Sequence, residues 1–345
     1  MDLVSYLNSV EGLRAVDRTI SAQLVTPNDA GNLVYPTFFP PLDVPSVKLG
    51  EIVIGNFRPV ASRREWNGPG RLIPVRTPGT RDIEIIPVES YFTLGEREIQ
   101  TLVEQTDNNE ALILGSMGAD FPSRTDGLAE ADERRIEADA LTVWATGSLT
   151  QDDPQTGRTY VTDFKYAAGR MQTAGTAWTN VTAYANFMAW LADCPFPAGG
   201  VYLRQATYNA IEAGAPNLLN GYRPTMRDIQ QRITDTRGLP FRFVVEEGTL
   251  DFPVDGGIDF ASTKKWAANR LAAIPVDGRV GRTAFAPVVR AAEFQRTFPD
   301  AGVKRNRVTV YYNSLNEGKG AKVSAQVNAL SVPAEGTLWT MNAGI

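Results

Sequence analysis

Two pairs of carboxylates are the residues of this sequence whose types and spacing could do chemistry. Asp255 and Asp259 are four residues apart, and Glu246 is followed directly by Glu247. Paired carboxylates can act as general acid and general base, as they do in glycoside hydrolysis. Both pairs lie in glycine-rich or strand-edge segments, which are more typical of solvated loops. We therefore expect no catalytic residues and keep a carboxylate-dependent enzyme as an alternative.

The composition removes most other kinds of active site. The 345 residues include no histidine, which excludes Ser-His-Asp and Cys-His catalysis and nearly all zinc sites. The single cysteine, Cys194, follows an aromatic-rich segment and is interpreted as a buried structural thiol. Asp152 and Asp153 lack the alternating ligand spacing of a calcium loop, so a turn is expected there. The segment 278–282 has no Walker lysine. We predict no cofactor and no metal.

The charge balance bears on the choice of partner. The sequence has 34 basic and 39 acidic residues, a net charge of -5, and the two signs are interspersed. A protein that reads nucleic acid sequence would be expected to carry a basic patch or arm. No apolar run approaches the roughly 18 residues that a membrane span needs, and the start lacks the pattern of a secretion signal. We expect a soluble intracellular protein that neither reads nucleic acid sequence nor enters a membrane.

The elements that would position any site begin with an irregular stretch near the N-terminus. Residues 34–42 combine three prolines with bulky apolar and aromatic side chains, which predicts neither a regular helix nor a central strand. An exposed apolar strip is a liability on a single chain. We therefore expect Phe38 and Phe39 to lie along a neighbouring surface.

A long hairpin is predicted next. The strand-like arms 52–61 and 72–88 are separated by an arginine-rich turn that contains Asn-Gly and Pro-Gly. A two-stranded hairpin of this length is barely stable alone. The hairpin should therefore lie on another subunit.

Helices and strands alternate through the rest of the chain. A capping box at 93–96 predicts a helix start. The longest helix is expected over 128–149, with Ile136 and Trp144 on one apolar face and the i, i+4 pairs Glu130–Arg134 and Arg135–Asp139 on the others. Such charges are typical of a solvated helix face, and pairing between subunits would use the same residues. Further helices are predicted at 181–192, 206–213 and from Thr225, and strands at 159–164, 201–203, 241–246, 271–275, 307–313, 323–332 and 338–341. This mixed order predicts an α+β fold.

This order of elements resembles the major capsid proteins of lambda-like tailed bacteriophages, which have the Hong-Kong-97-type capsid fold. The segments that look most like the family are 77–79, 91–94, 133–137, 155–157, 305–308, 325–330 and 338–340. The resemblance implies an N-terminal arm (1–49), an extended loop (50–92), a peripheral domain with a spine helix (93–195), an axial domain (196–300) and C-terminal strands that return to the peripheral domain (301–345).

The resemblance also implies a function. It implies pentamers and hexamers of an icosahedral virion shell, assembled in the host cytoplasm around double-stranded DNA without sequence-specific binding. Some members of the fold class cross-link a loop lysine to a neighbour, but this chain has no lysine between Lys48 and Lys165. Its shell should then be noncovalent, with a separate scaffold protein, a portal and a decoration protein as partners. A cellular nanocompartment of the encapsulin kind and a gene-transfer particle remain alternatives.

The intersubunit contacts expected from this reasoning lie in the proline-rich stretch, the hairpin loop and the long helix. They are Phe38, Phe39, Arg63, Arg64, Glu65, Trp66, Arg71, Arg76, Arg81, Glu133, Arg134, Arg135 and Asp139.

Overall fold

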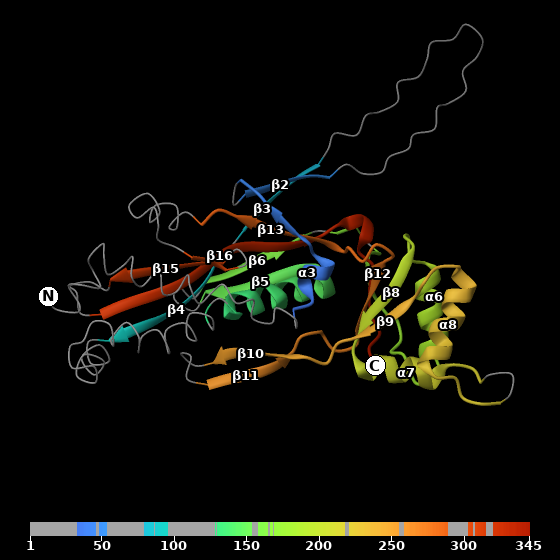
Figure 1. Ribbon diagram of the computed structural model, residues 1–345. Coiled ribbons are helices and arrows are strands. Elements are labelled where there is room, and N and C mark those ends of the chain that lie inside the picture. The colour runs from blue at the N-terminus through green and yellow to red at the C-terminus, as the bar shows by residue number, and fades with distance from the viewer. Residues whose placement is uncertain are drawn as a thin grey trace, which may run out of the picture.

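The computed structural model describes residues 33–45, 48–53, 79–85, 87–95, 128, 130–153, 158–164, 166–167, 169–217, 221–254, 259–288, 303–305, 308–314 and 320–345. Figure 1 shows two main sheets side by side, one on the left and one on the right with three helices beside it. The first lies above a long helix formed by residues 128 and 130–146.

The larger sheet is organised around its longest strand, β16. β4, β13 and β15 all pair with β16 in antiparallel orientation, and β1 pairs with β13 in parallel orientation. A strand from the first hundred residues is thus hydrogen-bonded to one from the last thirty. The strands are β1 (Pro41–Asp43), β4 (Pro87–Gly95), β13 (Gly281–Ala286), β14 (Val303–Arg305), β15 (Val308–Ser314) and β16 (Gly320–Pro333).

The second sheet has the order β7-β17-β12-β8-β9. Its central strand β12 is antiparallel to both β17 and β8. The strands are β7 (Met171–Thr173), β8 (Ala198–Leu203), β9 (Arg242–Val245), β12 (Arg270–Pro275) and β17 (Thr340–Asn342), and a short 3-10 turn (Glu335–Thr337) precedes β17. The accompanying helices are α6 (Ala183–Ala192), α7 (Gln205–Gly214) and α8 (Met226–Arg237).

Helix α8 illustrates how the local sequence determines where an element begins and ends and which of its side chains are buried. The Thr225 and Asp228 side chains cap each other's backbone amides, and Gly238 ends the helix with a left-handed φ of 65°. Met226, Ile229 and Ile233 follow helical spacing and are buried in the core that this sheet shares with its helices.

The long helix packs on the larger sheet through one apolar face. Ile136, Ala140, Leu141 and Trp144 share a core cluster with side chains of β13, β15 and β16. Gly147 ends the helix with φ 71°, a backbone conformation that side-chain-bearing residues rarely adopt.

An aromatic cluster joins the two sheets. Trp144 of the long helix lies 5.1 Å from Tyr202 of β8 and 5.3 Å from Trp266, measured between ring centroids. Phe38, from the short helix α3 (Tyr35–Phe38), lies 5.0 Å from Trp144, and Phe39 lies 6.0 Å from it. The N-terminal segment is therefore part of the core.

Three two-stranded antiparallel sheets complete the described chain. They are β2 (Lys48–Val53) with β3 (Gly79–Glu84), β5 (Ser148–Asp153) with β6 (Arg158–Asp163), and β10 (Thr249–Val254) with β11 (Asp259–Lys264). The β2–β3 pair confirms antiparallel pairing at the base of the predicted hairpin.

Most of the elements predicted from residue 159 onward are confirmed. Helices α6, α7 and α8 lie where the apolar periodicity places them, and strands β6, β8, β9, β12, β15 and β16 match the expected segments to within a few residues. β17 begins two residues later than expected. The division of the chain into five regions stays a prediction.

Four local predictions were wrong. The long helix ends at residue 146, because Gly147 turns the chain and Leu149 lies in β5. Thr93 and Gly95 do not begin a helix, because they pair with Lys322 and Gly320 of β16.

The other two errors concern turns and arms. Asp152 and Asp153 lie at the end of β5, paired with β6, and not in a turn. The return arm of the hairpin is not one strand to residue 88, because β3 ends at Glu84 and β4 begins at Pro87 in another sheet.

Candidate functional site

A buried carboxylate, Glu137, holds the N-terminal segment on the long helix. Both of its oxygens accept the backbone N–H of Val34 at 3.0 Å, and Oε2 accepts that of Tyr35 at 2.7 Å. Lys265 Nζ lies 3.5 Å from Oε1. Burial raises the pKa of Glu137, while these amides and Lys265 act in the opposite direction. The carboxylate thus joins three segments that are far apart in the sequence.

A second carboxylate contact lies beside the first. Tyr202 donates its hydroxyl to Glu246 Oε2 at 2.8 Å, and the Gly248 amide donates to Glu246 Oε1 at 2.7 Å. Burial, together with the charge of Glu246, raises the pKa of Tyr202. Glu246 therefore fixes the connection between β9 and β10.

The neighbouring Glu247 is an exposed acceptor. The Gln205 amide donates to it at 2.9 Å, and Lys264 Nζ lies 3.0 Å away. The Gln205 hydrogen bond, followed by Lys264, lowers the pKa of Glu247. Asp255 lies outside the described residues, and the side chain of Asp259 is not described. Glu246 and Glu247 thus have structural partners, which removes the motivation for reading that pair as acid and base.

The prediction that Phe38 and Phe39 form an exposed strip is wrong. They are 2% and 0% exposed, inside the aromatic cluster around Trp144. Pro36 lies in the first turn of α3, where its missing N–H breaks no helical hydrogen bond, so the proline-rich stretch folds inward.

The charged face of the long helix is partly buried. Arg134 and Glu130 form the expected pair at 2.9 Å, as do Arg135 and Asp139. Glu133 and Asp139, expected on accessible faces, are only 4% and 7% exposed. Arg134 and Arg135 keep accessible side chains, and their contact with another subunit stays a prediction.

The predicted contacts in the hairpin loop lie mostly outside the described residues. These are Arg63, Arg64, Glu65, Trp66, Arg71 and Arg76. Arg81 lies in β3, where its backbone pairs with Glu51 of β2, and its side chain is not described.

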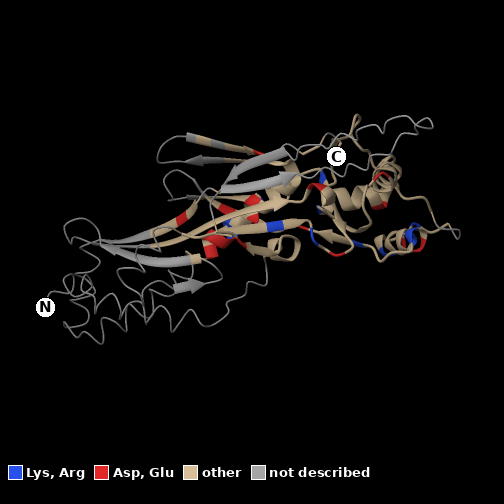
Figure 2. Cartoon of the chain, turned by 90° about the horizontal axis from the view of Figure 1, so that it is seen from above, with Lys and Arg blue, Asp and Glu red and all other residues tan. Residues whose placement is uncertain are grey.

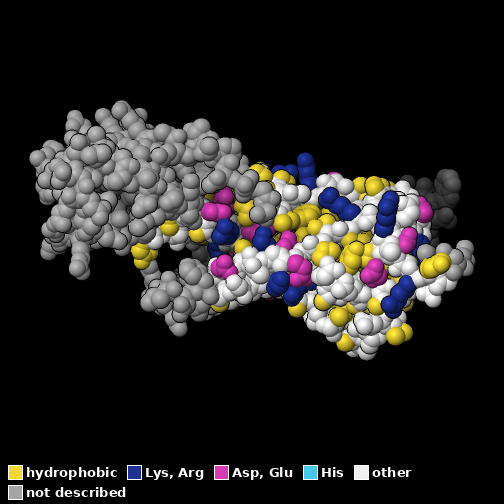
Figure 3. Space-filling view, turned by 60° about the horizontal axis from the view of Figure 1, so that its bottom comes forward, with side chains coloured by type: hydrophobic (Ala, Val, Ile, Leu, Met, Phe, Trp, Pro, Cys, Tyr) yellow, Lys and Arg dark blue, Asp and Glu magenta, His cyan; other side chains and the backbone are white. Residues whose placement is uncertain are grey.

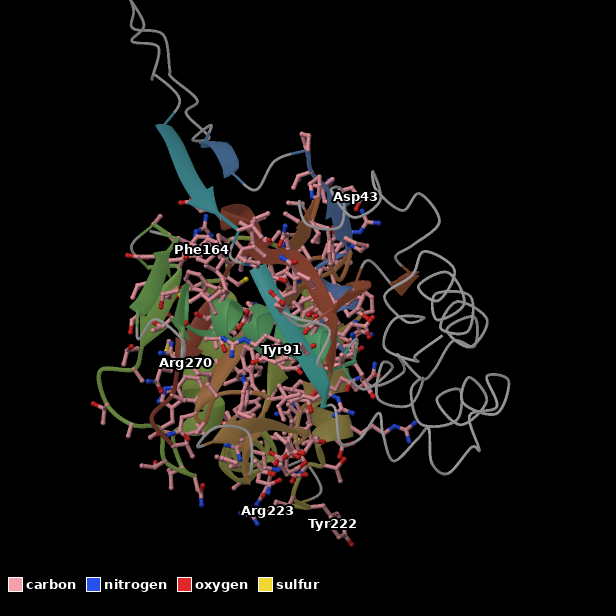
Figure 4. The ribbon with its side chains drawn as sticks, turned by 90° about the vertical axis from the view of Figure 1, so that its left-hand side faces the viewer. Asp43, Tyr91, Phe164, Tyr222, Arg223 and Arg270 are labelled. Atoms are coloured by element: carbon pink, nitrogen blue, oxygen red, sulfur yellow. The ribbon has the colours of Figure 1, made fainter. Side chains whose placement is uncertain are left out.

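Exposed apolar side chains were not found by sequence reasoning. Val181 is 83% exposed and Tyr222 is 71% exposed. In Figure 4, Tyr222 and Arg223 lie at the bottom of the view, Asp43 lies near the top, and Tyr91 lies at β4.

Charges of both signs are mixed along the described ribbon (Figure 2), as the sequence predicts. On the face in Figure 3, apolar side chains lie between basic and acidic ones.

Within the described residues no cluster of three or more His, Cys, Asp or Glu could hold a metal ion. Cys194 is half-buried rather than fully buried, and burial raises the pKa of its thiol. None of the described helices is long and apolar enough to span a membrane.

Comparison with known proteins gives matches among solved structures. No family model matches the sequence, and no curated protein matches it. A crystal structure assigned to the capsid protein of a prophage in Escherichia coli CFT073 superposes with a TM-score of 0.53 at 12% identity, covering 94% of this chain and 98% of that one.

Two further structures are similar at lower scores. A phage-related protein from Bordetella bronchiseptica RB50 has a TM-score of 0.45 at 13% identity, covering 95% of this chain and 97% of that one. The capsid of Myoviridae phage XM1 has a TM-score of 0.43 at 15% identity, covering 86% and 85%. On the strength of the prophage match, the chain has the α+β fold of a phage capsid protein, the Hong-Kong-97-type capsid fold.

Proposed function

We propose that this chain is the major capsid protein of a tailed phage and works by self-assembly rather than by catalysis. Copies of the chain form pentamers and hexamers that close into an icosahedral shell around double-stranded DNA. The observation that carries the proposal is the superposition on the prophage capsid protein, which spans 94% of this chain and 98% of the other. A match over nearly the whole of both chains means that the fold is shared as a unit.

The shell of this protein is held together without covalent cross-links. The extended loop, residues 50–92, contains no lysine, so it cannot supply the amine of an isopeptide bond. Its described base, the β2–β3 pair, forms a two-stranded sheet. A long hairpin gains stability by lying on a neighbouring subunit.

The charge of the chain suits a container for DNA. The net charge is -5, and the sequence has no lysine-rich block or basic arm that would hold phosphates. DNA is therefore enclosed without sequence-specific binding. A scaffold protein, a portal and a decoration protein are the proposed partners, in a virion assembled in the host cytoplasm.

The experiment is electron microscopy and sedimentation of the chain produced with and without the scaffold gene from the same gene cluster. We expect closed megadalton particles when the scaffold is present. A chain that stays a stable monomer under both conditions would overturn the proposal.

The contents of particles from a complete infection separate the phage shell from a nanocompartment. We expect nuclease-protected double-stranded DNA of one length. Particles that contain a cargo enzyme and no DNA would identify a nanocompartment instead.

A further inference from the structure

The N-terminal segment, residues 33–44, is bound to the core at two separate places. The upstream place is the Glu137 carboxylate, which accepts the backbone N–H of Val34 at 3.0 Å and that of Tyr35 at 2.7 Å. In Figure 1 the short helix α3 lies against the long helix that carries this carboxylate. The downstream place is strand β13, to which β1 is paired in parallel orientation.

The upstream contact depends on the carboxylate more than on the side chains of the segment. Both of its hydrogen bonds are made with backbone amides. Tyr35 is buried, but Val34 is only half-buried, and Pro36 and Thr37 are exposed. Removing the carboxylate should therefore remove much of what binds this end of the segment.

The downstream contact is formed by a different set of groups. Val280 donates its N–H to the Phe38 carbonyl at 2.8 Å. Thr283 donates its hydroxyl to the Phe39 carbonyl and its N–H to the Pro40 carbonyl, both at 3.2 Å. None of these hydrogen bonds involves Glu137, so the downstream contact does not require the upstream one.

Aromatic packing strengthens the downstream place. The side chains of Phe38 and Phe39 are buried against Trp144, and the Phe38 ring also lies 5.6 Å from that of Tyr202. Burial of two phenylalanine side chains is a large stabilising contribution for a segment this short. The downstream part should therefore stay bound when the upstream part leaves.

The turn between the two places can unwind. It is the four-residue helix α3, closed by hydrogen bonds from Thr37 to the Val34 carbonyl and from Phe39 to the Tyr35 carbonyl. A helix this short is not stable by itself in water. Release of its upstream end should therefore unwind it, without breaking the contacts with β13.

The open state does not leave an isolated buried charge. Lys265, which follows β11, has its Nζ 3.5 Å from Glu137 Oε1, and both side chains are buried. When the segment leaves, Lys265 keeps its position beside the carboxylate, and water can replace the two amides. The cost of burying a charge without compensation is thus avoided.

We propose that Glu137 is a releasable latch, from which residues 33–37 open as a local unit while residues 38–44 stay on β13. The inference goes beyond the proposed function, because it concerns the folded chain whether or not shells form. Residues 1–32 are joined to the chain at the opening end. Release of the latch therefore frees their point of attachment without unfolding the rest of the chain.

Hydrogen–deuterium exchange of the unassembled full-length chain tests the latch. Exchange is compared between the segment 33–37 and the segments 42–45 and 280–284, which report on the downstream contact. In Glu137→Met, a side chain of similar length without an acceptor, two hydrogen bonds to a charged group are lost. Exchange in 33–37 should then rise about 100-fold or more, while the other two segments keep their wild-type rates.

Glu130→Met is the matched control, because it makes the same substitution at an exposed position of the same helix. It should leave exchange in all three segments at the wild-type rate. The latch is overturned if Glu137→Met raises exchange equally in all three segments, because the N-terminal segment then opens as one unit. It is also overturned if Glu137→Met changes none of them.

A measurement on the wild-type chain keeps the test decisive if Glu137→Met does not fold. Exchange is followed at low urea concentrations, below the unfolding transition. A local opening exposes little surface, so the opening of 33–37 should depend only weakly on urea and be more frequent than that of 280–284. Equal opening frequency and equal urea dependence in the two segments would overturn the latch.

Discussion

At the scale of single residues, the described chain buries ionisable groups to hold distant segments together. Glu137 has no exposed surface and makes its contacts to the N-terminal segment and to Lys265 in the core. A buried charge of this kind is tolerated only because hydrogen bonds and an opposite charge compensate its lost hydration. Removing it should therefore cost more than removing an exposed charge of the same helix.

We predict that Glu137→Ala lowers the free energy of unfolding by about 3–5 kcal/mol, because it removes the buried acceptor of two backbone amides and a charged partner of Lys265. Urea unfolding of the unassembled chain measures the change. The matched control is Glu130→Ala, which breaks only the exposed pair with Arg134 and should cost about 1 kcal/mol or less. Equal losses in the free energy of unfolding would show that the buried Glu137 contact stabilises the fold no more than the exposed Glu130 pair does.

At the scale of elements, the ends of helices and strands decide which surface each segment joins. Gly147 turns the chain from the long helix into β5, and a Cβ at this position would clash with Met171 Sδ and lie 3.2 Å from the Tyr166 ring. The end of the long helix thus depends on glycine both for its backbone conformation and for space.

We predict that Gly147→Ala destabilises the chain more than Gly238→Ala, which replaces the glycine at the end of α8. Both glycines have left-handed backbone angles, so both variants carry a conformational cost of about 1 kcal/mol. The space around Gly238 is open, so only Gly147→Ala adds a steric clash. Thermal unfolding should give a clearly lower midpoint for Gly147→Ala, and a lower midpoint for Gly238→Ala would contradict the argument.

The extended loop supplies a second prediction at this scale. Reversing the charge of Arg63, Arg64 and Arg76 together, by substitution to glutamate, should leave the chain folded and weaken or block shell formation. These arginines lie outside the described residues, so the expectation rests on the loop composition and the proposed contact with a neighbour. Circular dichroism checks folding and electron microscopy counts shells. Substitution of the same three residues by lysine keeps the charge and should assemble, whereas normal shells from the glutamate variant would refute the role of the loop.

At the scale of the whole molecule, the long C-terminal strand β16 brings together parts of the chain from both ends. It pairs with β4, β13 and β15, and the aromatic cluster around Trp144 joins this sheet to the second one. Such long-range pairing means that the fold cannot be divided into independent sequential pieces. In the proposed shell, we expect the contacts with neighbouring copies on loops and exposed faces.

We predict that assembled particles dissociate completely into single chains when boiled in SDS, because residues 49–164 contain no lysine for a cross-link from the loop. Gel electrophoresis of purified particles gives the result directly. Particles of a cross-linked member of the same fold class serve as the control and should keep a ladder of multimers. A ladder from this chain would mean that another nucleophile forms the bond.

By itself the sequence determined the mixed fold class, most of the elements predicted from residue 159 onward and the start of α8 at Thr225, because apolar periodicity and helix-start residues are local signals. Family resemblance also anticipated the fold that the prophage match supports. Only the tertiary structure decided that Phe38 and Phe39 point inward, that Thr93 and Gly95 belong to a strand, and that Asp132 and Glu137 are buried. These outcomes depend on partners more than forty residues away, such as Trp144 and β16, and no local pattern encodes such contacts.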